Sequence, residues 1–268
     1  MSRNQRLALL IGISVIAITA TLFVPPIAQD LEYHNLADRR MIGGIPNFFD
    51  VASNLAFLLV GVSGLWYLFQ IREDRSRLID KWEAYPLAVA FAGTVLIFAG
   101  SAYYHWAPAN ETLAWDRLPM TLAFMGIFSM VLVERINVKA GINFLIPLLL
   151  VGAASVAYWH VTEQSGQGDL RPYALVQFLP VLLILMMLWL FPARYSGARY
   201  LVEMIAWYAV AKVLEFLDAA IWEWTGGWIA GHSLKHCAAA WGIYALVRYL
   251  KHRRALPVDS PKPADQSF

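Results

Sequence analysis

The chain has 268 residues, of which 59% are hydrophobic and 15% charged, and its formal net charge is +2. An ordinary soluble domain has about 45–50% apolar and about 25% charged residues, so this composition argues against a soluble protein and for an integral membrane protein. The basic residues lie in short clusters between apolar runs, which argues against a nucleic-acid partner. The single cysteine, Cys237, excludes an intramolecular disulfide framework and a zinc site made of several thiolates.

Eight segments have the apolar character of a membrane-spanning helix, which needs roughly 20 residues to cross about 30 Å of hydrocarbon. Prolines stop the first and sixth segments, because proline lacks the N–H that a helix interior requires. We expect spans at 7–24, 50–70, 85–106, 116–134, 142–161, 173–191, 200–224 and 229–250. The predicted fold is an all-α, polytopic membrane helical bundle with one domain over residues 1–256 and a polar tail over 257–268.

The first segment has an alternative interpretation as a secretory signal, because Arg3 and Arg6 precede an apolar run. The run is long for a signal peptide, and Pro26 makes a poor cleavage site before Ala28. We therefore expect this segment to remain as an additional span; its cleavage would leave seven.

Lysine and arginine are retained in cytoplasmic loops, and their distribution predicts the topology. With the N-terminus inside, fifteen of the 21 basic residues fall on the cytoplasmic side and four on the opposite side, while Lys212 and Lys235 fall within spans. This distribution predicts a multi-pass protein with both termini in the cytoplasm. The sequence shows no internal repeat.

Three polar clusters are expected to meet on the non-cytoplasmic side, where the third span ends and the fourth and eighth begin. They contain Ser101 and His105, then Asp116, then His232 and His236. Ionisable groups in membrane helices are costly and are candidates for function. Residues four apart share a helix face, so His232 and His236 can hold one ion together.

Three histidines suit catalytic zinc, which keeps three protein ligands and one open position. Zinc lowers the pKa of a bound water to about 7 and so supplies a nucleophile at neutral pH. Asp116 is the candidate general base, and Ser101 is the candidate donor to a metal-bound water or to a developing oxyanion. Structural alternatives exist for both residues: Ser101 could bond to its own helix, and Asp116 could cap the fourth span.

Two further polar groups have structural and functional interpretations. One face of the seventh span contains Lys212, Glu215 and Asp218. These residues form either a buried charge network that fixes helix packing or a proton path. The first of these is the favoured interpretation. At the start of the second span, Asp50, Ser53 and Asn54 are either helix caps or partners of the metal ligands.

The clusters together resemble the alkaline ceramidases and the wider superfamily of membrane hydrolases that includes the progestin and adipoQ receptors. The resemblance covers residues 30 to 250 and rests on four stretches in the family's order: Asn47 to Leu55, Gly100 to His105, Asp116 to Met120, and His232 to His236. It implies a seven-helix core in which His105, His232 and His236 hold zinc and Ser101 and Asp116 assist hydrolysis of ceramide to sphingosine and a fatty acid.

The chain departs from this family in two respects. It has an additional predicted span before the seven-helix core. The acidic, calcium-binding N-terminal segment of eukaryotic alkaline ceramidases is not matched, since Asn47 stands where they have a glutamate. The resemblance therefore extends to zinc and not to calcium.

The leading functional hypothesis is a zinc-dependent amidohydrolase for a ceramide-like lipid amide that reaches the site laterally from the membrane. The alternative is a receptor-like membrane protein in which the zinc is structural, although the short loops leave no large domain for signalling. A transporter that uses Lys212, Glu215 and Asp218 is a third class, but the repeated halves typical of transporters are lacking. Membrane lipids are the one further partner that the sequence indicates, and it leaves the oligomeric state open.

Overall fold

The computed structural model describes residues 1–257, and within them every regular element is helical, which confirms the all-α fold class. The predicted polar tail lies, after Pro257, outside the described residues. The elements in chain order are α1 (Arg3–Phe23), η1 (Leu31–His34), α2 (Phe48–Ser53), α3 (Leu55–Ile71), η2 (Lys81–Glu83), α4 (Ala84–Trp106), α5 (Asn110–Arg135), α6 (Val138–Gln164), α7 (Arg171–Leu190), α8 (Arg199–Phe216), α9 (Asp218–Trp224) and α10 (Gly231–His252).

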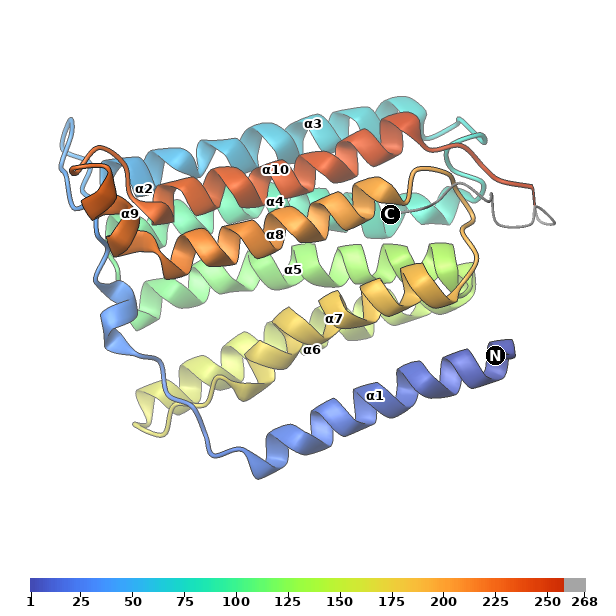
Figure 1. Ribbon diagram of the computed structural model, residues 1–268, viewed down its shortest axis with the longest axis horizontal. Helices are drawn as coiled ribbons and strands as arrows, with labels where there is room; N and C mark the ends of the chain where they lie inside the picture. The colour runs from blue at the N-terminus through green and yellow to red at the C-terminus, as the bar shows by residue number, and fades with distance from the viewer. Residues whose placement is uncertain (258–268) are drawn as a thin grey trace.

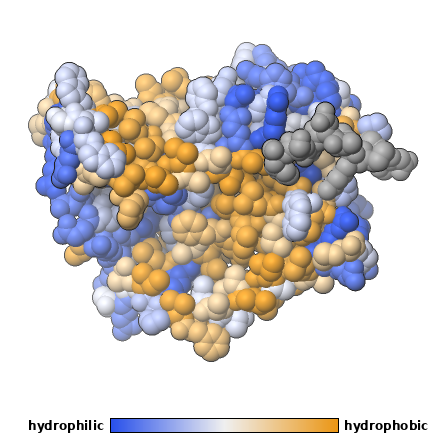
Figure 2. Space-filling view, in the orientation of Figure 1, coloured by the Kyte–Doolittle hydropathy of each residue, from blue (hydrophilic) through white to orange (hydrophobic). Residues whose placement is uncertain are grey.

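Six helical segments of the described chain are long and apolar enough to cross a membrane: α1, α2 with α3, η2 with α4, α5, α6 and α7. The helices α8 and α10 are of similar length but carry more charged residues, among them Lys212, Glu215 and Lys235. The face shown in Figure 2 has a broad hydrophobic area over its middle and hydrophilic residues toward its two ends. These features are those of an integral membrane protein.

The helices run roughly antiparallel along the long axis, and the start of α1 and the end of α10 lie at the same end of the bundle (Figure 1). Helix α5 packs on α4, α6 and α7, while α10 packs on α3 and α8. The first helix contacts α7 at the edge of the bundle, and Leu10 is its one buried residue. Most of its apolar side chains therefore depend on lipid rather than on protein for their burial.

Two of the predicted spans are interrupted, which the hydropathy pattern did not indicate. The predicted span 200–224 is wrong as one helix, because it breaks at Leu217 into α8 and α9. The cause is Asp218, whose carboxylate accepts hydrogen bonds from the backbone N–H groups of His232 and Ala37. The predicted span 50–70 likewise breaks at Asn54, where α2 ends and α3 begins.

Glycines let the central helices approach closely. A Cβ atom on Gly100 of α4 would lie 2.1 Å from the backbone oxygen of Trp115 in α5, and one on Gly93 would lie 2.7 Å from the backbone nitrogen of Ala123. Only glycine fits at such contacts. The contact at Gly100 lies next to Ser101 and Asp116, so it sets the distance between the two helices at the predicted site.

At the opposite end of the bundle, a buried ion-pair cluster fixes the last turn of α10. The fully buried guanidinium of Arg253 donates to Glu134 of α5 at 2.6 Å and lies 3.8 Å from Glu83. The hydroxyl of Tyr249 donates to the second oxygen of Glu134 at 2.8 Å. Because α10 also carries two of the predicted metal ligands, this cluster restrains the helix that holds them.

Candidate metal centre

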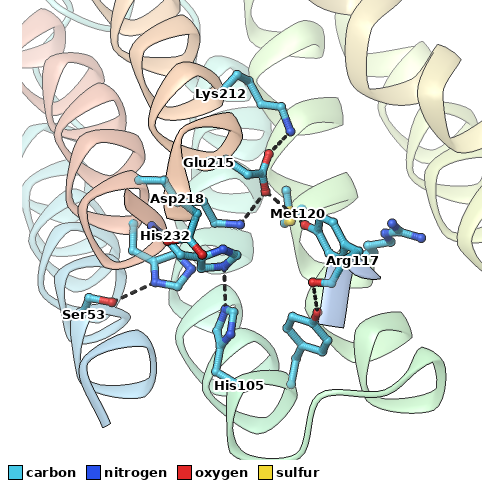
Figure 3. A network of polar contacts seen from close by, with 12 residues as sticks. Ser53, His105, Arg117, Met120, Lys212, Glu215, Asp218 and His232 are labelled. Carbon is cyan, nitrogen blue, oxygen red and sulfur yellow. Dashed lines mark hydrogen bonds and ion pairs between the residues drawn. The ribbon is translucent and has the colours of Figure 1, made fainter. Parts of the chain in front are cut away.

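Three buried histidines from two helices come together at the end of the bundle where α2 and α9 lie. His105 is in the last turn of α4, while His232 and His236 occupy the first turns of α10 on one face. One ligand nitrogen from each ring lies within 4.8 Å of the others, and Nε2 of His105 is 3.3 Å from Nε2 of His232. This contact is visible in Figure 3. The predicted meeting of these histidines is confirmed.

The donor set fits a metal ion. Bonds of about 2.0–2.1 Å in a tetrahedral zinc site place neighbouring nitrogens roughly 3.4 Å apart, and the contact between His105 and His232 has this spacing. All three rings are almost fully shielded from solvent. Imidazole donors in a buried group of three can therefore bind a metal ion, and they leave a tetrahedral ion one position for another ligand.

Two residues near the start of the second predicted span support α10 from outside the histidine group. The hydroxyl of Ser53 lies 2.8 Å from Nδ1 of His236, which leaves Nε2 of that ring for an ion. Asp50 accepts a hydrogen bond of 2.5 Å from the hydroxyl of Ser233. Ser53 and Asp50 thus bind α10 instead of capping a helix. Contacts to the second nitrogen of a ligand histidine fix its tautomer and orientation.

Backbone contacts hold the other two histidines. Asn47 adopts a left-handed conformation with φ of 46°, which asparagine tolerates better than most residues, and its side chain donates to the carbonyl oxygen of His105 at 2.8 Å. That carbonyl is at the end of α4, where the helix itself offers no partner. Asp218 accepts from the backbone N–H of His232 at 2.7 Å in the first turn of α10, where a carboxylate also stabilises the helix dipole.

The predicted catalytic pair lies beside the histidines. The side chains of Ser101 and Asp116 are buried, interact with each other and line the same cavity as His236. The alternative that Asp116 caps its helix is wrong, because α5 begins six residues earlier at Asn110. The alternative that Ser101 bonds to its own helix is not found among the hydrogen bonds of the described residues.

The cavity next to this group has a volume of about 140 Å³ and runs between α3, α4, α5, α7, α8 and α10. At the histidine end it is lined by Ser101, Asp116, Glu215 and Lys235, and its other polar side chains besides His236 are Gln177, Tyr208 and Lys212. Further along the bundle the lining is apolar and includes Ile127, Ile184, Met204 and Ile243. From Asp116 to Ile127 the lining follows α5 for about 16 Å at 1.5 Å per residue, about half of the hydrocarbon thickness. The cavity is therefore amphipathic along the direction of the helices.

A charge network on α8 and α10 forms part of the polar end. Glu215 pairs with Lys212 and accepts from Nζ of Lys235 at 2.5 Å (Figure 3). Asp218 takes no part in these ion pairs and caps α10 instead. Lys235 is a functional candidate that was predicted to lie within a span but had no predicted role, although an ionisable residue in a membrane helix is a candidate for function.

The segment between α1 and α2 covers the histidine end. We call residues 31–47, which include η1, the covering segment; they run along the end of the bundle where α2 and α9 lie (Figure 1). Tyr33 donates to Glu215 at 3.0 Å, and the ring nitrogens of His34 lie 3.0 Å from the hydroxyl of Tyr104 and 2.9 Å from Asn110. Asn47 and the backbone of Ala37 add the contacts described above. The covering segment is thus bound to α4, α5, α8 and α9.

A scan against models of known protein families and a search of curated proteins found no match to this chain.

Proposed function

We propose that the chain is a zinc-dependent membrane amidohydrolase that cleaves the amide bond of a ceramide or a related lipid amide and releases a fatty acid. The observation that carries the proposal is the amphipathic cavity, whose polar end adjoins three buried histidines and whose other part is apolar. A lipid amide has the same division between a polar linkage and an acyl chain. The resemblance to the alkaline ceramidases implies the same activity.

The roles of the side chains follow from their positions. Zinc, when bound, supplies a water nucleophile at neutral pH and polarises a carbonyl group. In this proposal Asp116 accepts the proton of the attacking water and Ser101 donates a hydrogen bond to the oxyanion, which is supported by their position in the cavity that His236 also lines. Ser53 and Asn47 act as positioning residues for His236 and His105. The apolar lining excludes bulk water from the acyl chain.

Access for a lipid is expected from the side of α8. Helix α8 packs chiefly on α10, and it meets α5 across the cavity through the rings of Tyr208 and Phe124, whose centroids are 5.8 Å apart. The covering segment closes the end of the bundle. A substrate that resides in the membrane would therefore enter between α7 and α8, with its polar linkage toward the histidines.

The experiment measures metal content and fatty-acid release on the same purified samples, using wild type and the double variant His232→Ala/His236→Ala with a panel of lipid amides. We expect about one zinc per chain and release of fatty acid for wild type, and neither for the variant. Zinc without release from any amide would favour the alternative, a receptor-like protein with structural zinc. Absence of bound metal in wild type would contradict the proposal.

A further inference from the structure

The polar end of the cavity contains two lysines that share one carboxylate. Glu215 binds Lys212 through one oxygen, while Lys235 and the hydroxyl of Tyr33 contact the other. Each ammonium group has three N–H donors, and within residues 1–257 the hydrogen bonds of both lysines go to Glu215 alone. The carboxylate thus accepts three hydrogen bonds, while the two lysines have donors to spare.

The charges of the cavity lining balance without a ligand, but unevenly. Lys212, Lys235, Glu215 and Asp116 are the lining side chains with ordinary full charges, and they cancel in pairs. Asp50 and Asp218 also lie at the histidines, where they bond to Ser233 and to the backbone of His232, so they can offset the charge of a bound ion. Within the described residues, Lys212 shares Glu215, its one ion-pair partner, with Lys235, and a charge in a membrane interior is costly unless it is well paired.

Lys212 lies where a ligand can reach it. On α8 it is three residues further from the histidine end than Glu215, and 39% of its side chain is exposed. It lines the cavity on the side of α8, where we expect lipids to enter. Lys212 lies four residues before the end of α8, in a helix that we expect to cross the membrane, so an anionic group of a membrane lipid can reach its exposed ammonium group.

We propose that Lys212, Glu215 and Lys235 form a subsite for an anionic group on the amine portion of the substrate, so that the preferred lipid is an N-acyl amino acid. This rests on the proposed function. The acyl chain would lie along the apolar lining, which leaves the carboxylate at the lysines beside the scissile amide. In the reaction water supplies hydroxyl to the acyl carbon and a proton to the nitrogen, the C–N bond breaks, and a fatty acid and an amino acid are released.

The test compares N-oleoylglycine with N-oleoylethanolamine, which differ in a carboxylate against a hydroxymethyl group. Binding is measured by calorimetry and turnover by fatty-acid release, on full-length, metal-loaded protein in nanodiscs of uncharged lipid. We expect wild type to prefer the glycine conjugate about tenfold in both measurements, as one charge-assisted contact provides. Lys212→Gln should lose this preference by weakening the glycine conjugate alone, while Lys212→Arg should retain it. Lys139→Gln, which changes a lysine outside the cavity, should alter neither lipid.

The two proposals fail separately. A binding preference that Lys212→Gln removes, without fatty acid from either lipid, would support the subsite and contradict the hydrolase. Release from both lipids at equal efficiency, or faster release from ceramide than from either, would overturn the subsite and support the hydrolase. The wild-type comparison needs no variant, so it decides the question even if a substitution prevents folding.

Discussion

Ser53 contacts the metal centre through His236. Its effect on metal binding can therefore be measured separately from any effect on catalysis. Loss of its hydroxyl leaves Nδ1 of His236 without the contact at 2.8 Å, and such partners of ligand histidines typically change metal affinity about 10–100-fold. We expect Ser53→Ala to weaken zinc binding by at least about tenfold in a competition with a chromophoric chelator. Ser63→Ala is the matched control, because Ser63 is exposed in the next helix, α3, and bonds to its own backbone. Equal affinity of both variants would remove Ser53 from the site.

A substitution of Asp116 should lower the rate of catalysis without lowering the affinity for metal. It lines the cavity beside Ser101 and is not one of the three histidine ligands. Asp116→Asn keeps the shape of the side chain and removes its basicity, so we expect kcat to fall about 10²–10⁴-fold while zinc content stays at the wild-type level. The measurement is fatty-acid release beside metal analysis. A fully active Asp116→Asn protein would end the assignment of Asp116 as general base.

The residues of the metal centre could be predicted because their signal is local. His232 and His236 are four apart, and the alternation of spans places His105 at the same end of the bundle. The partners Asn47, Asp218 and Lys235 were not assigned these roles, since each acts on a residue distant in sequence. No hydropathy or spacing pattern reports that an asparagine side chain reaches a helix end 58 residues away.

Helices α4 and α5 meet at Gly100, and this contact is decisive for the site. A methyl group there would overlap the backbone oxygen of Trp115 at 2.1 Å, and backbone cannot move aside as a side chain can. We expect Gly100→Ala to destabilise the protein by about 1–3 kcal/mol or more and to lower zinc affinity, since His105 and Asp116 would separate. Gly12→Ala in α1 meets nothing within 4 Å and is the control. Thermal unfolding and metal titration of the two variants test this; equal behaviour would contradict the close packing.

The positions of the helices were largely predictable, and their interruptions were not. Long apolar runs predict a helix because every backbone polar group in lipid must be bonded internally. At the break after Leu217, Asp218 bonds across the bundle to the backbone of His232, and at the other break the side chain of Asn54 bonds to the backbone oxygen of Asp50 one turn earlier. Hydropathy is insensitive to such contacts, and it also placed the start of α5 six residues late because polar residues precede Asp116.

Arg253 ties the far end of the bundle together. It is fully buried between Glu134 and Glu83, and its removal would take the ion-pair partner from Glu134, whereas Glu83 would keep Arg194 at 3.6 Å. We expect Arg253→Ala to cost about 3–5 kcal/mol of unfolding free energy, the usual penalty for breaking a buried ion pair. The neighbouring exposed Arg254→Ala should cost less than about 0.5 kcal/mol. Denaturation of both variants in the same detergent provides the comparison.

The start of α1 and the end of α10 lie at one end of the bundle (Figure 1), and the histidines lie at the other, in the last turn of α4 and the first turns of α10. The basic residues predict that the first of these ends is cytoplasmic. A reporter fused after Phe268 should therefore be active in the cytoplasm, and one inserted at Gly226 in the loop after α9 should be active on the opposite side. Activity of the Phe268 fusion outside the cytoplasm would reverse the orientation.

The covering segment has a consequence for how fast an ion is exchanged. It is bound to four helices and lies over histidines that are almost inaccessible to solvent, so a chelator cannot approach an ion from that end while these contacts persist. Release would then proceed at the rate at which the segment opens. That rate does not depend on the concentration of the chelator, so extraction should follow first-order kinetics that saturate as more chelator is added. Metal loading would be slow for the same reason, and the ion would be most easily acquired before this segment closes during folding.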